Sequence, residues 1–183
     1  MQGSLRAVLW MGLSILLLFS ACTVKEKGAS TATQAQLVST LGQLETQLRL
    51  APEQDLDTTK VTTFVDYAQA LAERFPQDSL APLYLFRAAE LSYATGQLNA
   101  AIDLWGKISS SFNKYNRSPE AAFMQGFVAE NDLKDKEKAI NFYQAFLTQY
   151  PEHPMAKDAQ VLVDNLKKGI SDRELIEQFE QQQ

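Results

Sequence analysis

The sequence repeats itself at a spacing of 37 to 38 residues, and this repeat restricts the fold more than any other feature. Phe64, Ala101 and Ala139 lie 37 and 38 residues apart. An aromatic residue follows each of them at the same distance along the chain: Phe75, Phe112 and Tyr150. Self-similarity at a period of this size is typical of a solenoid, in which each unit packs on the next.

The apolar residues of the repeats follow a helical period. Within residues 61–75, 98–112 and 139–150 they recur at i, i+3, i+4 and i+7, which gathers them on one helix face. Partner helices are expected at 81–94, 119–131 and 154–168, and a first helix at about 36–50. The sequence therefore predicts an all-α helical-hairpin solenoid of about seven to eight helices over residues 34–183.

Capping residues predict several helix ends. Gly96 and Gly169 follow two of the expected helices, where a glycine permits the left-handed conformation. Ser118 is expected to be an N-cap, with Pro119 as the first helical residue. Ser171 and Glu174 form a capping-box pattern that opens a last, capping helix.

Leucines recur in a 4-3-4 pattern in the first expected helix: Leu37, Leu41, Leu44 and Leu48. This stripe is interpreted as a half-repeat that packs on the helix at 58–75. A short coiled coil is the alternative, although two heptads are marginal alone.

Residues 58–168 resemble the tetratricopeptide repeat (TPR). This motif has a small residue in its first helix, then an alanine and an aromatic residue in the second, and a final proline. Two positions depart from the motif in its first helix, where Leu85 and Ser92 replace the usual Trp and Tyr. Asn113 also stands where a proline is expected, and the insertion KYNRSP follows it. The matching residues are Ala89 and Gly126, Ala101 and Ala139, Trp105 and Tyr143, and Pro76 and Pro151.

The stretches FPQDSLAP and YPEHPMAKDA resemble a subclass of TPR proteins from the bacterial envelope. Examples are the TPR lipoprotein of the outer-membrane β-barrel assembly machine and the TPR protein linked to the Tol–Pal system. The resemblance implies a concave groove lined by the first helix of each repeat. The residues expected in this groove are Phe86, Glu90, Tyr93, Phe123, Phe127 and Glu130.

Aromatic residues interleaved with carboxylates suit a peptide or helix that carries basic and apolar groups. The alternative is that Phe86, Phe123 and Phe127 are core residues. A carboxylate clamp of the TPR type is not expected, because Phe86 and Glu90 stand where it needs Lys and Asn.

Residues 1–21 have the features of a signal peptide. Ala7 to Phe19 is an apolar stretch that spans only roughly 20 Å as a helix, too short for a hydrocarbon core of about 30 Å. It ends in Phe19-Ser20-Ala21-Cys22, which resembles a bacterial lipobox, and Cys22 is the single cysteine of the chain. We predict a lipoprotein acylated on Cys22. An ordinary secretory signal cut after Ala21 is the alternative.

The segment after the cysteine is small and polar, so residues 22–33 are expected to be a flexible tether between the lipid and the folded part. By resemblance to lipoproteins of two-membrane bacteria, Thr23 favours the outer membrane over retention at the inner one. The expected location is the outer membrane, facing the periplasm.

The composition argues against several classes of function. The net charge of −5 disfavours nucleic acid, whose phosphates need a basic face. With one Cys and one His, the chain forms no internal disulfide and no Cys/His metal cluster. His153 stands in an expected turn, and the acid pairs Asp132/Asp135 and Glu174/Glu177 stand at helix starts or exposed faces.

We therefore expect a non-enzymatic, lipid-anchored scaffold or adaptor that has no cofactor, no metal and no catalytic residue. Its partner is an envelope protein or peptide of unknown identity, and its oligomeric state is open. The alternatives are a cell-wall (peptidoglycan) enzyme or its accessory that uses a carboxylate pair, and a structural subunit that only spaces other components.

Overall fold

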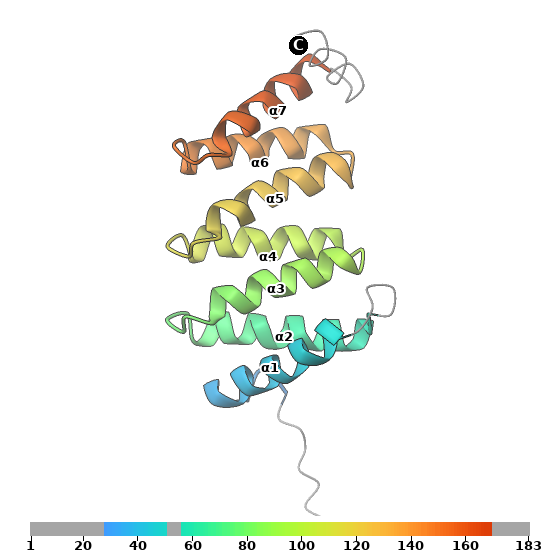
Figure 1. Cartoon of the computed structure of the whole chain (residues 1–183), viewed down its shortest axis with the longest axis vertical. Coiled ribbons are helices and arrows are strands. Elements are labelled where there is room, and N and C mark those ends of the chain that lie inside the picture. Colours follow the sequence, from blue (N-terminus) through green and yellow to red (C-terminus); the bar gives the residue numbers. More distant parts are fainter. Residues whose placement is uncertain (1–27, 51–55, 170–183) are drawn as a thin grey trace, which may run out of the picture.

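The computed structural model describes residues 28–50 and 56–169, and this part of the chain is a stack of seven α-helices without a strand. Figure 1 shows the odd-numbered helices in one layer and the even-numbered helices in a second layer behind it. The helices are α1 (Gln34–Leu50), α2 (Thr58–Arg74), α3 (Ala81–Ala94), α4 (Leu98–Ser111), α5 (Ser118–Asn131), α6 (Lys136–Gln149) and α7 (Ala156–Lys168). The predicted all-α, TPR-like helical repeat fold is confirmed.

The predicted repeat corresponds to equivalent positions in the structure. Phe64, Ala101 and Ala139 lie in the even-numbered helices, and each is 0% exposed. Phe75 and Phe112 are the C-cap residues of α2 and α4, and Tyr150 is the C-cap residue of α6. Each helix packs chiefly on the next one along the chain, as expected for a solenoid whose units bury their apolar faces on one another.

The three turns that lead into α3, α5 and α7 share one pattern of backbone hydrogen bonds. In the first, the Asp78 amide donates to the Phe75 carbonyl and the Ala81 amide donates to the Asp78 carbonyl. The same two bonds recur from Tyr115 and Ser118, and from His153 and Ala156. His153 is thus a turn residue, as expected, and its Nδ1 accepts a hydrogen bond from the Met155 amide at 3.3 Å.

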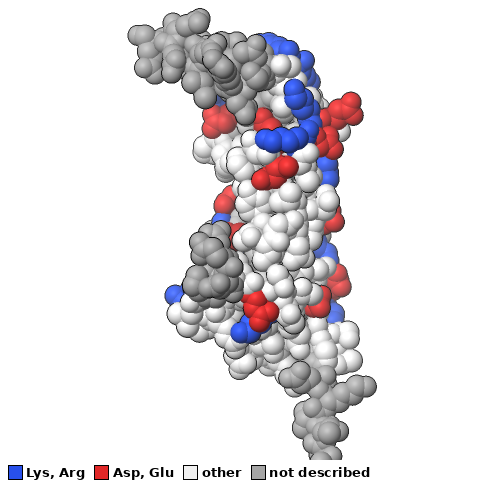
Figure 2. Space-filling model, turned by 90° about the vertical axis from the view of Figure 1, so that its right-hand side faces the viewer, with Lys and Arg blue, Asp and Glu red and all other residues white. Residues whose placement is uncertain are grey.

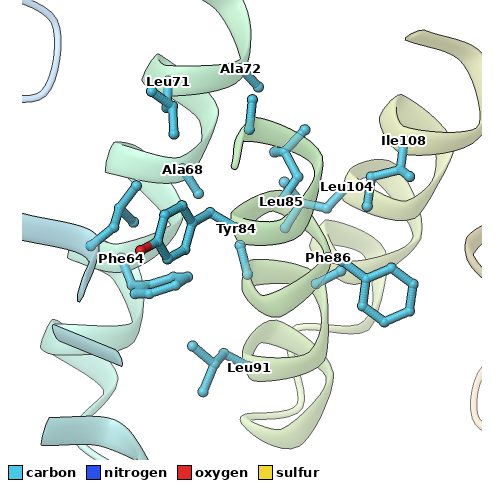
Figure 3. Packing of buried hydrophobic residues seen from close by; sticks show 14 of the residues in the cluster. Phe64, Ala68, Leu71, Ala72, Tyr84, Leu85, Phe86, Leu91, Leu104 and Ile108 are labelled. Carbon is cyan, nitrogen blue, oxygen red and sulfur yellow. The ribbon is translucent and has the colours of Figure 1, made fainter. Parts of the chain in front are cut away.

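Aromatic residues of neighbouring helices pack on one another. Phe64 of α2 and Tyr84 of α3 meet edge to face with 6.0 Å between ring centroids, and Figure 3 shows Phe86 pointing to the other side of α3, toward α4.

Small residues let the helices approach closely. In the last repeat, a Cβ atom on Gly126 would lie only 2.6 Å from ring carbons of Tyr143. A glycine at this position of α5 is therefore a packing requirement.

Two predicted caps are confirmed and one is wrong. Gly96 and Gly169 have φ angles of 75° and 71°, in the left-handed region. Ser118, however, is the first residue of α5 and not its N-cap, which is Arg117. The Ser118 side chain is buried and its hydroxyl donates to the Ile108 carbonyl at 3.2 Å, so it ties α5 to α4 instead of capping its own helix.

The start of α1 carries a capping box that the sequence analysis missed. The Thr33 amide donates to Gln36 Oε1 at 2.9 Å, and the Gln36 amide donates to Thr33 Oγ1 at 3.3 Å. The pattern Thr-x-x-Gln is the signal that predicts such a box. The buried leucines Leu37, Leu41 and Leu48 pack α1 on α2, in agreement with the half-repeat interpretation.

Residues 28–33, the second half of the expected tether, lie against the solenoid. Arg74 of α2 donates hydrogen bonds to the carbonyls of Ala29 and Ala32, at 3.0 and 2.7 Å, and Ala32 is 2% exposed. Residues 28–33 therefore do not lengthen the expected tether between the lipid and the solenoid. The expected signal peptide, Cys22 and the expected capping helix from Ser171 lie outside the described residues.

We expect Gly126→Ala to lower the free energy of unfolding. The new methyl group gains up to about 1 kcal/mol of helix propensity but overpacks Tyr143 at a cost of about 1–3 kcal/mol. The matched control is Gly42→Ala in α1, where the added Cβ would lie 3.8 Å from the Tyr84 hydroxyl, an ordinary contact. Urea unfolding followed by circular dichroism tests the pair. Equal stabilities of the two variants would contradict the close approach of α5 and α6.

Candidate functional site

The six predicted groove residues occupy three matched positions on α3 and α5. Phe86 and Phe123 are the sixth residues of their helices, Glu90 and Phe127 the tenth, and Tyr93 and Glu130 the thirteenth. They lie in the layer of odd-numbered helices (Figure 1). We call the face of this layer that points away from the even-numbered helices the concave face.

The aromatic side chains at these positions differ in exposure. Phe86 is 1% exposed and packs on Trp105 with 6.5 Å between ring centroids. Tyr93 packs on the same indole at 6.1 Å, and half-buried Phe123 packs on Tyr143 at 5.2 Å. Phe127 is 37% exposed. Of the predicted groove aromatics, Phe86 is thus a core residue that supports the groove, while Phe127 has the ring surface that a partner can reach.

Glu90 is neutralised by two arginines of this chain. Its carboxylate lies 3.3 Å from Arg87 and 3.3 Å from Arg117. The Arg117 guanidinium also donates two hydrogen bonds to Glu120, at 2.7 and 2.8 Å, and lies 3.5 Å above the centroid of the Phe86 ring. The hydrogen bond with Glu120 is the main cause that raises the pKa of Arg117.

Arg117 contacts two of the predicted groove residues, Phe86 and Glu90, but was not itself predicted at the groove. It belongs to the insertion KYNRSP, which was noted only as a departure from the TPR pattern. Its cation sits between two carboxylates and on an aromatic face, a geometry that favours a guanidinium. The Glu90 carboxylate is therefore already paired within the chain.

Glu130 is connected to the core through Tyr143. The Tyr143 hydroxyl donates to the Glu130 carboxylate at 2.9 Å. Burial raises the pKa of the Tyr143 phenol, and the negative charge of Glu130 raises it further. The Glu130 carboxylate is thus positioned by a buried ring of α6.

A hollow of about 230 Å³ lies on the same face, between the end of α1 and the middle of α3. The repeat pattern did not predict this hollow, because α1 lies outside residues 58–168, which resemble the TPR motif. Leucine side chains and the charged groups of two arginines surround it. The described residues that line it are Leu48, Arg49, Leu56, Arg87, Glu90, Leu91 and Ala94.

The acid pair Asp132/Asp135 has local structural roles. Asp135 is the N-cap of α6 and accepts a hydrogen bond from the Lys138 amide at 3.0 Å. Asp132 lies near Tyr93, whose pKa is raised first by burial and then by the charge of this carboxylate. The second pair, Glu174 and Glu177, lies outside the described residues.

In residues 28–50 and 56–169, no group of three or more His, Cys, Asp or Glu side chains is placed to hold a metal ion. Among the helices of these same ranges, none combines the length and the apolar character that a membrane crossing needs. Lys and Arg are interspersed with Asp and Glu over the edge of the stack that Figure 2 shows.

We expect the stability of the fold to decrease as the pH rises above about 10, the ordinary pKa of tyrosine. The phenol of Tyr143 holds its proton to a higher pH in the folded chain than in the unfolded chain, so the unfolded state loses protons first. Tyr143→Phe should reduce this alkaline loss of stability. Unfolding curves at neutral and alkaline pH test it, and an unchanged pH dependence in the variant would contradict it.

Comparison with known proteins identifies one repeat of a known family within the residues of this site. The family model of the tetratricopeptide repeat matches residues 120–153, which span most of α5, all of α6 and the turn after it. A search of curated proteins finds no match to the chain. The matched repeat carries Phe123, Phe127 and Glu130. TPR repeats generally mediate protein–protein interaction, and this chain has the corresponding TPR-like helical fold.

Proposed function

We propose that this protein is a lipid-anchored adaptor of the bacterial envelope that docks another envelope protein on the concave face of its solenoid. The observation that carries the docking role is the exposed ring of Phe127 within the matched repeat. Aromatic residues on a groove are typical anchors for a protein segment. The partner is a protein, and no chemistry on a bound substrate is part of the proposal.

The rigid construction of the groove supports this function. Phe86, Tyr93 and Phe123 are packed on rings of α4 and α6, and Glu90 is held by two arginines. A surface whose side chains are already positioned loses little conformational entropy when a partner binds. The concave face is therefore suited to recognition without rearrangement.

The anchor is proposed from the sequence. Cys22 is the single cysteine and follows a leader of the length and composition of a signal peptide. Acyl chains on this residue would tie the protein to a bilayer, since each buried CH₂ group contributes about 0.8 kcal/mol and stable anchoring takes more than one chain. Thr23 favours the outer membrane, with the solenoid in the periplasm.

We expect a photo-crosslinking amino acid to capture a partner protein in living cells when it replaces exposed concave residues. Suitable positions are Leu83, Ala94 and Phe127, and matched exposed positions on the even-numbered helices are Asp103 and Gln144. The same partner bands should appear from the concave set and be absent from the control set. Adducts from the control positions alone would place docking on the opposite face.

We expect Cys22→Ser to release the protein from membranes, because the acceptor sulfur for the acyl chains is removed. Fractionation of cells and metabolic labelling with palmitate measure the two consequences. Wild-type protein is the control for both assays. Full membrane retention of the variant, or palmitate labelling equal to that of the wild type, would contradict lipidation at this residue.

A further inference from the structure

The two junctions between successive odd-numbered helices use equivalent positions with different chemistry. The α3–α5 junction consists of the tenth residue of α3, the N-cap of α5 and the third residue of α5, which are Glu90, Arg117 and Glu120. At the α5–α7 junction the equivalent residues are Phe127, Met155 and Asp158. The repeat therefore places an aromatic ring, a thioether and a carboxylate where the first junction has an ion-paired network.

The α3–α5 junction is closed by the chain itself. Arg117 covers the Phe86 ring at 3.5 Å and bridges Glu90 and Glu120. Phe86 is 1% exposed beneath it. A cation between two carboxylates and over an aromatic face satisfies both the charges and the apolar surface at this position.

The α5–α7 junction lacks the equivalent cation. Phe127 is 37% exposed. Asp158, in the first turn of α7, is exposed, and within the described ranges it forms no ion pair. The Phe127 ring and the Asp158 carboxylate are therefore both accessible where the first junction has the Arg117 network.

We propose that a partner segment supplies at the α5–α7 junction what Arg117 supplies at the α3–α5 junction. The partner inserts an arginine or lysine toward Asp158, and apolar side chains beside this cation pack on Phe127. This inference rests on the proposed function, since it identifies the partner chemistry of the same concave face. The occupant is a protein segment in which a basic residue is flanked by aromatic or aliphatic residues.

Charge complementarity favours this occupant over an acidic one. Asp158 is exposed and forms no ion pair with the described residues. It would repel an acidic segment, whereas it attracts a cation, and matched potentials across an interface increase specificity and association rate.

The experiment uses the full chain in detergent and a phage-displayed library of random short peptides as the probe. Peptides selected on the wild type are synthesised and their dissociation constants measured by fluorescence anisotropy. The variants are Asp158→Asn, which removes the charge, and Met155→Arg, which installs the missing cation in the chain. Asp103→Asn on exposed α4 surface is the matched control, and unfolding curves verify that each variant folds.

We expect the selected peptides to carry Arg or Lys next to aromatic or aliphatic residues. They should bind Asp158→Asn and Met155→Arg about tenfold more weakly than wild type, a loss of about 1.4 kcal/mol. Asp103→Asn should bind like wild type. Selected peptides without a basic residue, or equal binding to Asp158→Asn and Asp103→Asn, would overturn the inference.

A third variant separates this inference from the proposed function. Ala94→Arg changes the concave face at the end of α3, away from the α5–α7 junction. If only Ala94→Arg weakens binding, the concave face docks a protein but the junction is wrongly assigned. If every concave variant binds the peptides like wild type, the inference and the docking role are both wrong.

Discussion

The whole structure depends on the inability of any single helical hairpin to bury its own apolar surface. Each helix packs chiefly on the next one in chain order, so the core is a continuous strip along the stack. Close packing requires small residues at fixed positions, and Ala89 and Gly126 occupy them. Where Gly126 faces Tyr143, the space for even one methyl group is absent. The fold is therefore set by local contacts that repeat, and its stability is distributed along the rod.

The same repetition explains how function can differ from one repeat to the next. The three turns before α3, α5 and α7 share their backbone hydrogen bonds, so residues at equal distances from each turn have equivalent places on the concave face. Evolution can then change the chemistry at one place without changing the backbone. Arg117 and Met155 illustrate this freedom, because both are N-cap residues of odd-numbered helices. One closes its junction with an ionic network, and the other leaves an aromatic ring exposed.

Much of the fold was predictable because helical periodicity and capping are local properties. The expected helix at 81–94 has the bounds of α3, and Gly96 and Gly169 adopt the left-handed conformation expected after a helix. Ser118 was misplaced because its side chain bonds to Ile108, a contact across the turn between α4 and α5 that propensity does not encode. The candidate site was predicted as a set of positions, but Phe86 proved to be buried and Arg117 was missed. The burial of Phe86 and the contacts of Arg117 both depend on which side chains from different repeats meet in space.

The sequence by itself determined the repeat, the helical class and most helix ends, because each follows from spacing along one chain, whereas the six groove positions were implied by the resemblance to the TPR motif. Tertiary structure alone decided which of these side chains remain accessible and which charges remain unpaired. Glu90 and Asp158 have the same charge in the sequence, yet Glu90 is neutralised by Arg87 and Arg117 while Asp158 is exposed. The physical reason is that burial and ion pairing are properties of neighbours in space, which helices from different repeats contribute.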